Sequence, residues 1–398
     1  MQYRIDKKTG NKLSVLGFGC MRFPGIFGRP DMQKTEEMVM YSIEKGVNYF
    51  DTAWIYPGSE ETIGTIFKKN NVRDRIYIAT KLPLVFLNGS SSAVDFDRYF
   101  NQSLQRLKTD YVDYYHMHMI TDLDQWQKLK KAGIENWITE KKKSGQIRQV
   151  GFSFHGTGSE FLKILYDYDW EFSLIQYNYS GENYQAGKQG VYAAAAKMPV
   201  VVMEPLLGGK LVTGLPKEAV KIFQKADANL SPAGWALNWL WNQEEVTTLI
   251  SGMSNMEQLE ENLRLADAAA AGMLNDSQHI VYKSVLEYVN RASKILCTGC
   301  NYCMPCPKGI DIPSCFAAYN VSFMQNFLTG LSQYITSIAG LTKKQNSPRY
   351  CTECGRCESH CPQNLPIRKL LKRVAGRLET IPIRFGLSIV RFLFSMMK

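Results

Sequence analysis

The chain has 398 residues, of which 45% are hydrophobic, so it is long enough to form two or three domains with substantial cores. Its formal net charge is +10, but residues 368–398 carry eight basic side chains against one acidic side chain and account for +7 of it. The basicity is therefore a property of the tail, and it does not indicate a nucleic-acid-binding protein.

The cysteines are concentrated in one stretch. Nine of the ten lie between Cys297 and Cys361, and Cys20 is the exception. This distribution indicates a metal module in a reducing compartment and argues against the disulfide framework of a secreted protein. The N-terminal residues also lack the apolar segment of a signal peptide. We therefore expect a cytoplasmic protein.

From residue 13 to about residue 270, short apolar runs alternate with amphipathic segments. The predicted strands are Leu13–Gly19, Val47–Asp51, Ile76–Lys81, Val112–His118, Gln149–Ser153, Phe172–Tyr177, Val200–Glu204 and Thr247–Ser251. The predicted helices are Lys34–Lys45, Glu60–Asn70, Ala93–Leu107, Ile134–Ser144, Glu160–Tyr168, Gln185–Lys197, Ala233–Trp241 and Met256–Ala270. Eight strands that alternate with helices predict an α/β fold, a (β/α)8 TIM barrel. No G-x-G-x-x-G motif follows an early strand, so a Rossmann fold is not supported.

Polar residues stand at the ends of three consecutive predicted strands. Asp51 ends the second strand, Lys81 ends the third and His118 ends the fourth, while Tyr56 follows Asp51 by five residues. Active sites of such barrels lie at the carboxyl ends of the strands. We therefore expect these four side chains to carry the chemistry.

The surrounding stretches resemble the aldo-keto reductase family over about residues 1–270. They are Phe50–Tyr56, Ala79–Lys81 and Tyr111–His118. The resemblance implies that Tyr56 gives a proton to a substrate carbonyl oxygen while NAD(P)H delivers a hydride to the carbon. It also implies that Lys81 lowers the pKa of the tyrosine, that Asp51 pairs with the lysine, and that His118 orients the carbonyl.

These residue types suit that chemistry. A phenol with an ordinary pKa of about 10 is a poor acid at neutral pH unless a nearby cation stabilises its phenolate. Taken singly, Asp51 could cap a helix, Lys81 could be solvated and Tyr56 could be one of many surface tyrosines; their joint placement at strand ends favours the tetrad. His116 lies on the same side of the strand as His118. The family's spacing selects His118, and we interpret His116 as a packed interior histidine.

The same resemblance implies a nucleotide site. Ser153 and Gln176 match residues that hold the nicotinamide amide, although Phe154 stands where asparagine is usual and Met203 where an aromatic residue is usual. The other expected contacts are Leu206, Gly208 and Lys210 at the pyrophosphate and Glu261 and Asn262 at the adenine. Gly252 and Gln258 replace the basic residues that normally hold the 2′-phosphate of NADP. The choice between NADP and NAD is therefore open.

Two cysteine ladders follow the barrel, and each ends in Cys-Pro. The second has the C-x2-C-x2-C-x3-C-P spacing of bacterial [4Fe–4S] sites, and the first is one residue shorter before its last cysteine. In two-cluster ferredoxins the Cys-Pro cysteine ligates the cluster of the other ladder. This crossing predicts one cluster on Cys297, Cys300, Cys303 and Cys361, and a second on Cys351, Cys354, Cys357 and Cys306. A zinc ribbon would need only paired C-x2-C motifs.

The C-terminal region resembles a mainly helical dicluster ferredoxin domain, because a helical pattern from Ile312 to about Leu341 separates the ladders. Cys315 is an alternative to Cys306 as a ligand, or a buried core cysteine. We predict a barrel over residues 1–275, a helical linker over 276–296, the ferredoxin-type domain over 297–367 and a basic amphipathic tail over 368–398. The tail is too short and charged to span a bilayer. It either packs as a terminal helix or contacts an anionic membrane surface or an acidic partner.

The main functional hypothesis is an NAD(P)H-dependent reductase that acts on a small-molecule carbonyl or alcohol and carries two 4Fe–4S clusters. The alternatives are an electron-transfer protein whose barrel is a docking body, and a reductase whose clusters are structural. Hydride carries two electrons whereas each cluster exchanges one, so coupling the two needs a converter, usually a flavin. We recognise no flavin motif in the sequence. Either a partner flavoprotein or an unrecognised flavin site supplies that step, or the clusters are not in the hydride path. If the clusters exchange electrons with another protein, a ferredoxin or a flavoprotein is the expected redox partner.

Overall fold

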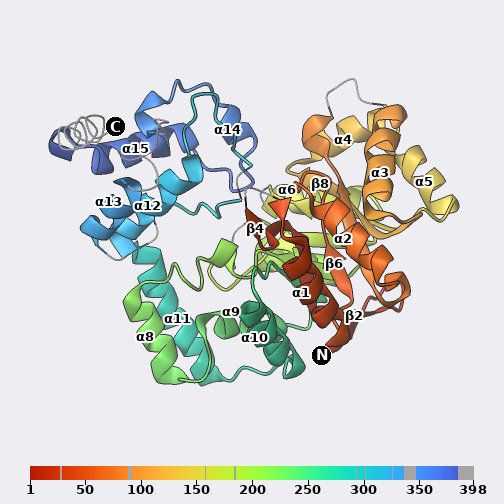
Figure 1. Ribbon diagram of the computed structural model, residues 1–398, viewed down its shortest axis with the longest axis horizontal. Helices are drawn as coiled ribbons and strands as arrows, with labels where there is room; N and C mark the ends of the chain where they lie inside the picture. Colours follow the sequence, from red (N-terminus) through yellow and green to blue (C-terminus); the bar gives the residue numbers. More distant parts are fainter. Residues whose placement is uncertain are drawn as a thin grey trace. The chain divides into compact units, whose positions relative to one another are not determined.

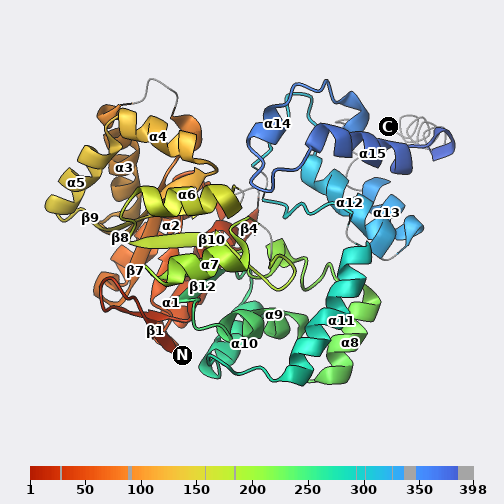
Figure 2. The same cartoon turned by 180° about the vertical axis from the view of Figure 1, so that it is seen from behind.

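The computed structural model describes residues 1–26, 29–87, 92–156, 158–182, 185–292, 294–300, 302–324, 326–335 and 347–383. The chain divides into two compact units (Figures 1 and 2). The first contains Met1–Pro205 and Gly234–Asn275, and the second contains Leu206–Ala233 and Asp276–Lys398. Residues 206–233 lie within the range that we predicted for the barrel, yet they belong to the second unit.

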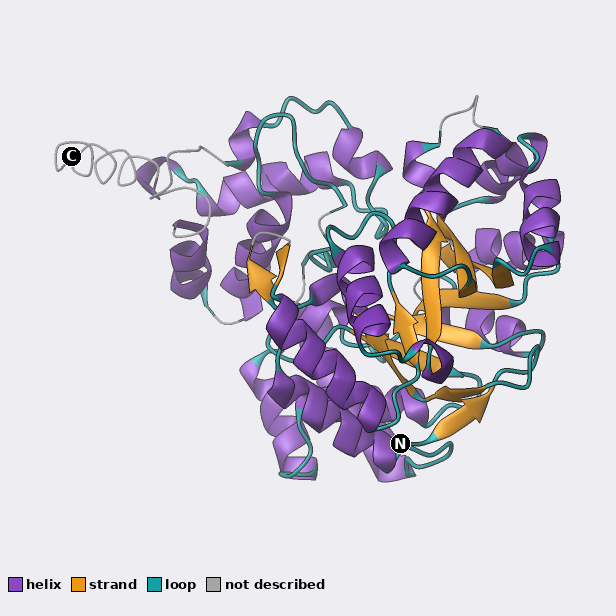
Figure 3. Ribbon diagram, turned by 45° about the vertical axis from the view of Figure 1, so that its right-hand side comes forward, coloured by secondary structure: helices purple, strands orange, loops and turns teal. Residues whose placement is uncertain are grey.

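The first unit is built on a closed barrel of eight parallel strands (Figure 3). Their order around the barrel is β10-β11-β12-β3-β6-β7-β8-β9. The bounds are β3 Leu16–Gly19, β6 Tyr49–Asp51, β7 Tyr77–Leu82, β8 Val112–Ile120, β9 Ile147–Phe154, β10 Phe172–Gln176, β11 Val200–Met203 and β12 Thr248–Ser251. The predicted (β/α)8 fold is confirmed. The strands read as apolar runs because both of their faces are buried.

The first predicted strand, Leu13–Gly19, is wrong as a single element. It divides into β2 (Lys12–Ser14), which pairs antiparallel with β1 (Tyr3–Ile5), and the barrel strand β3. The break follows from Ser14, whose backbone N–H donates to Asn48 Oδ1 over 2.8 Å instead of continuing a barrel ladder. A further small hairpin consists of β4 (Gly25–Ile26) and β5 (Arg29–Pro30).

Helices surround the barrel strands of the first unit. Their bounds are α1 Met32–Glu44, α2 Ser59–Lys69, α3 Ala93–Leu107, α4 Leu123–Lys131, α5 Ile134–Lys143, α6 Gly158–Asp167, α7 Gly187–Ala195, α9 Pro232–Trp241 and α10 Met256–Asp267. The eight predicted helices are present, and α4 was not predicted. Its start is capped by Asp122, whose side chain accepts from the Gln125 backbone N–H over 2.8 Å.

The second unit is helical in its described part. Its helices are α8 Lys217–Ala226, α11 Asp276–Ala292, α12 Ile312–Met324, α13 Phe327–Tyr334, α14 Arg356–Ser359 and α15 Ile367–Leu378. The helical pattern predicted from Ile312 is interrupted after Met324, and Asn326 caps α13 by accepting from the Thr329 backbone N–H. Residues 336–346, where the pattern would end, and 384–398, the end of the predicted tail, lie outside the described residues. The searched helices include none long and apolar enough to cross a bilayer.

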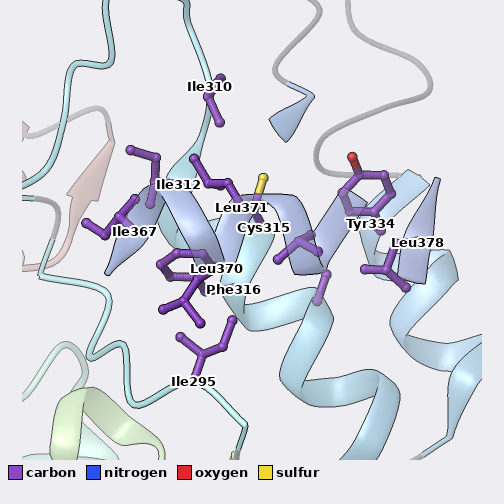
Figure 4. Packing of buried hydrophobic residues seen from close by; sticks show 12 residues of the cluster. Ile295, Ile310, Ile312, Cys315, Phe316, Tyr334, Ile367, Leu370, Leu371 and Leu378 are labelled. Atoms are coloured by element: carbon purple, nitrogen blue, oxygen red, sulfur yellow. The ribbon is translucent and has the colours of Figure 1, made fainter. Parts of the chain in front are cut away.

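The apolar face of α15 forms part of the core of the second unit (Figure 4). Ile367, Leu370, Leu371, Val374 and Leu378 are buried there against residues of α12 and α13, while Arg368, Lys369, Lys372 and Arg373 are exposed. The described part of the basic tail is thus an amphipathic helix packed on the protein, which was one of the two expectations for it.

Candidate functional site

A buried ion pair lies at the carboxyl ends of β6 and β7. Lys81 Nζ donates to Asp51 Oδ1 and to the Thr52 carbonyl oxygen, each over 2.6 Å. The exposed fractions of the two charged side chains are 1% for Lys81 and 2% for Asp51. The parallel register of β6 and β7 pairs Asp51 with Ala79, so that Lys81 extends just beyond the end of β6. The barrel therefore holds an ammonium ion at the carboxyl end of its strands without contact with bulk water.

His116 lies beside the same carboxylate. Its Nε2 atom is 3.5 Å from Asp51 Oδ2, and its ring packs edge-on against Phe172 with the centroids 4.6 Å apart. Burial lowers the pKa of His116 to about 4, although Asp51 opposes the shift. For Asp51 itself burial would raise the pKa, but Lys81 and His116 together hold it below its usual value. His116 is thus a neutral, fully buried imidazole inside the barrel.

Tyr56 and His118 also lie near Lys81. Tyr56 is half-buried in the loop between β6 and α2, and Lys81 Nζ lies 5.2 Å from its ring centroid. The His118 ring meets the Tyr56 ring edge-on with the centroids 6.2 Å apart. Burial, reinforced by the charge of Lys81, holds the pKa of His118 well below its usual value. The structure therefore brings together all four residues of the predicted tetrad, with a neutral imidazole next to the phenol.

A local irregularity of β8 follows His118. The register of β8 against β9 shifts between Met117 and Ile120, and Met119 takes a left-handed conformation with φ of 63°. A residue with a β-carbon seldom adopts this conformation without support. Here the Met119 backbone N–H donates to Ser153 Oγ over 2.8 Å. Ser153 therefore holds the strand in the bend that comes directly after His118.

His155, for which no role was predicted from the sequence, lies in the same neighbourhood. It follows β9 directly, is 3% exposed, and lies close enough to His118 to contribute to the lowering of the His118 pKa. Burial and the nearby Lys81 lower the pKa of His155 to about 3. Its position just beyond the carboxyl end of a barrel strand was the available signal.

The expected nucleotide contacts are divided between the two units. Ser153, Gln176 and Asn262 are buried in the first unit, where Gln176 Oε1 accepts from Gln185 Nε2 over 2.9 Å and Asn262 Nδ2 donates to Ser251 Oγ over 3.2 Å. Glu261 is half-buried on α10. Leu206, Gly208 and Lys210 belong to the second unit, and Lys210 Nζ donates to the Ile295 carbonyl oxygen over 3.5 Å.

Arg22 lies beside Gly252, one of the two positions at which this chain lacks the basic residue that is usual in the family. A β-carbon placed on Gly252 would come 3.4 Å from Arg22 Cδ, so the arginine stem covers the glycine backbone. Arg22 ends a short 3-10 helix, Cys20–Arg22, that follows β3, and it is exposed. Because β3 and β12 are neighbours in the barrel, a residue from the start of the chain reaches the loop after the last strand.

The cysteines of the ladders line two separate cavities in the second unit. The first cluster cavity is lined by Cys297, Cys300, Cys303 and Cys361, together with Ile312, Phe316 and other uncharged residues. The second cluster cavity is lined by Cys306, Cys351, Cys354 and Cys357, with Cys303 also at its wall. In each cavity the Cys-Pro cysteine comes from the opposite ladder. Four thiols around one cavity are the donor set of a [4Fe–4S] cluster, so these residues fit the group.

Cys315 lines neither of these cavities. Its side chain is fully buried in the apolar core of the second unit, next to Phe316 and Leu371 (Figure 4). Burial raises the pKa of the Cys315 thiol well above its usual value, and the nearby carboxylates of Asp311 and Glu379 add to the effect. This position matches the core interpretation of Cys315 given by the sequence analysis.

Comparisons with known proteins match both units. A sequence profile of the Aldo/keto reductase family matches residues 15–271, and a profile of the 4Fe-4S dicluster domain matches residues 296–366. The relatives include L-glyceraldehyde 3-phosphate reductase of Escherichia coli O157:H7, which is 25% identical over 309 residues that cover 66% of this chain and 87% of that protein. L-galactose dehydrogenase of Arabidopsis thaliana is 27% identical over 284 residues that cover 66% and 87%.

Solved structures share the fold. An aldo-keto reductase from Bacillus halodurans has a TM-score of 0.59 and 24% identity, and the match covers 72% of this chain and 96% of that chain. An aldo/keto reductase from Klebsiella pneumoniae, solved in complex with NADP and acetate, has a TM-score of 0.57 and 20% identity over 72% and 96% of the two chains.

Proposed function

Because the chain belongs to the aldo/keto reductase family, we propose that its barrel interconverts a small-molecule carbonyl compound and the corresponding alcohol with a nicotinamide dinucleotide. The chain is an oxidoreductase that carries a C-terminal 4Fe–4S dicluster domain. The observation that carries the proposal is Lys81, whose ammonium group is buried between Asp51 and the Thr52 carbonyl and lies 5.2 Å from the Tyr56 ring. Burying a charge in this way costs free energy of folding, and buried charged groups of this kind are concentrated at functional sites.

In this proposal Tyr56 is the general acid. Its hydroxyl gives a proton to the carbonyl oxygen, and Lys81 stabilises the negative charge that remains on the phenol oxygen. Asp51 keeps the ammonium group of Lys81 charged and in place. His118 is neutral, so one ring nitrogen carries a hydrogen that can bond the carbonyl oxygen while charge develops there. When bound, the reduced nicotinamide supplies a hydride to the carbonyl carbon.

The nucleotide would occupy the same end of the barrel. Ser153, Gln176 and Asn262 are polar side chains buried in the first unit at positions that match the family's nucleotide contacts, which supports their role as contacts. We further propose that Arg22 supplies the cation that Gly252 and Gln258 do not, because its stem already lies against Gly252. A guanidinium group binds phosphate well, so this placement favours NADP over NAD.

The two cavities support the crossed assignment of ligands: Cys297, Cys300, Cys303 and Cys361 for one cluster, and Cys306, Cys351, Cys354 and Cys357 for the other. Each cluster, when bound, exchanges one electron at a time. Since hydride transfer moves two electrons, we propose that the second unit serves exchange with a redox partner protein and not direct exchange with the nicotinamide.

The proposal is tested by Tyr56→Phe in the full chain with its clusters. NADPH-dependent reduction of a panel of small aldehydes should fall by a factor of roughly 10² to 10⁴, because the acid is lost while the ring remains. Tyr111→Phe is the matched control, since Tyr111 directly precedes β8, at the amino end of that strand, and stacks against Arg73 with 3.9 Å between guanidinium and ring centroid. Unchanged turnover in Tyr56→Phe would refute the assignment.

A further inference from the structure

The two cluster cavities differ sharply in charge. Apart from its cysteines, the first cluster cavity is lined only by uncharged residues: Thr298, Ile312, Pro313, Phe316, Pro362, Gln363, Leu365 and Ile367. The second cluster cavity is lined by three cationic side chains, Lys308, Arg356 and Arg368, and by the imidazole of His360. An electrostatic feature therefore distinguishes two sites whose cysteine ligands are otherwise equivalent.

The second cluster cavity also opens to the surface. Cys354 is exposed, whereas the other three cysteines of this cavity and all four of the first cluster cavity are only half-exposed. Lys308 and Arg356 are exposed as well. A cluster exchanges electrons with another protein only when it lies close to the protein surface. The cluster held by Cys306, Cys351, Cys354 and Cys357 is therefore the better placed of the two for contact with a partner.

The positive charge at this opening is only partly compensated. Arg368 Nη2 lies 2.7 Å from Glu358 Oε2, and Lys372 Nζ lies 2.7 Å from Glu353 Oε1. Among the residues that the structure describes, no ion pair involves Lys308 or Arg356 within 4.0 Å. These two side chains therefore carry uncompensated positive charges at the rim of an opening with apolar and cysteine walls.

We propose that the opening of the second cluster cavity is the docking site of a small acidic one-electron carrier protein, which Lys308 and Arg356 attract and orient over Cys354. This inference rests on the electron exchange proposed above and names its surface. In the exchange one electron passes between the carrier and the cluster, so that one is oxidised as the other is reduced, and no bond forms or breaks. Complementary charge of this kind raises association rates and sets orientation.

A membrane surface fits the opening less well than a protein. Lipid-binding surfaces combine basic residues with exposed large apolar side chains that enter the bilayer. Of the large apolar residues that line the second cluster cavity, Ile312 and Leu371 are buried and Met304 is only half-exposed.

The test uses the full chain with its clusters and the double variant Lys308→Glu, Arg356→Glu. The matched control is Lys225→Glu, Lys283→Glu, which makes the same change in net charge at exposed positions on α8 and α11 away from both cavities. Two acidic probes, a flavodoxin and a plant-type [2Fe–2S] ferredoxin, are titrated by calorimetry at low and high salt. Iron content and the electron paramagnetic resonance spectrum verify that each variant keeps its clusters.

We expect at least one probe to bind the wild type, and the Lys308/Arg356 variant to bind it roughly 10-fold more weakly or worse at low salt. The difference should nearly vanish at about 0.5 M salt, where charges are screened. The neutral variant Lys308→Gln, Arg356→Gln should bind the probe with an affinity between those of the wild type and the Lys308/Arg356 variant. The control should bind the probe as tightly as the wild type. Equal loss in the control, binding of neither probe, or binding to phosphatidylserine vesicles that depends on Lys308 and Arg356 would overturn the proposal.

The outcome is independent of the barrel assignment. Aldehyde reduction with NADPH is measured on the same samples and should be unchanged in all three variants. Loss of carrier binding with normal aldehyde reduction supports the docking site, whereas absence of aldehyde reduction in the wild type with normal carrier binding would refute only the function proposed for the barrel.

Discussion

Removal of the Lys81 ammonium group should destabilise the first unit strongly. In Lys81→Met the apolar stem stays, but the Asp51 carboxylate loses the partner at 2.6 Å and keeps only His116 at 3.5 Å. Breaking a buried pair by removing one partner costs roughly 3–5 kcal/mol, because the other charge is left uncompensated. For a unit of about 250 residues, this corresponds to a decrease in melting temperature of roughly 6–20 °C.

The assay follows from the tryptophan positions. All seven tryptophans, Trp54, Trp126, Trp137, Trp170, Trp235, Trp239 and Trp241, lie in the first unit. Their fluorescence during denaturant unfolding therefore reports the barrel and not the cluster-bearing unit. The control is Lys141→Met, which breaks a more exposed ion pair between Lys141 and Asp97 and should cost only about 0–1 kcal/mol.

The double variant Asp51→Asn, Lys81→Met distinguishes the attraction within the ion pair from the cost of leaving a single buried charge without a partner. If the cost of Lys81→Met comes from the stranded carboxylate, neutralising Asp51 as well should recover part of the lost stability. A loss below about 1 kcal/mol in Lys81→Met, or no recovery in the double variant, would refute the view that this ion pair is buried and mutually compensating.

Three further predictions follow from other features. Arg22→Gln should raise the KM for NADPH roughly 10-fold in steady-state kinetics and leave the KM for NADH nearly unchanged, because one phosphate contact is lost; an equal effect on both would contradict the role of Arg22. The pKa of His116 is about 4 in the folded protein against about 6.5 when unfolded, so the unfolded state binds more protons between these values and stability is lost as the pH falls through that window. From pH 7 to pH 5 the contribution of His116 amounts to about 2 kcal/mol, measured by tryptophan fluorescence during unfolding; His118 and His155, whose pKa values are also lowered, add to the total loss. His116→Gln should therefore reduce the loss by about 2 kcal/mol, and an unchanged pH dependence would contradict the buried neutral state of His116. Anaerobically purified wild type should contain about eight iron atoms per chain, Cys306→Ser should lose iron, and Cys315→Ala should keep it; the reverse result would exchange the ligand roles of these two cysteines.

Local patterns in the sequence were sufficient for the barrel elements. The apolar runs that end at Asp51, Lys81 and His118 predicted β6, β7 and β8, because strands with two buried faces are recognisable without their partners. The family's motif spacing selected the same three residues and Tyr56 as the candidate tetrad. The prediction of the first strand failed because two hydrogen bonds between Ser14 and Asn48, 34 residues away, divide an apolar run that looks continuous.

Other features depended on contacts between distant parts of the chain. The sequence left Cys306 and Cys315 as competing ligands, and the packing of α12 against α15 places Cys315 in the core and Cys306 at a cavity. Likewise, His155 and Arg22 carry no motif. They reach the site only because closure of the barrel brings β9 next to β8 and β3 next to β12.

The sequence by itself therefore determined the element types, the polar strand ends and the two cysteine ladders, because each depends on a short periodicity or spacing. Tertiary structure decided which of those residues meet. It buried Lys81 against Asp51, separated the thiols into an uncharged cavity and a basic one, and joined residues 206–233 to the helical unit. Such convergence depends on long-range packing and burial, and no local pattern in a single sequence records them.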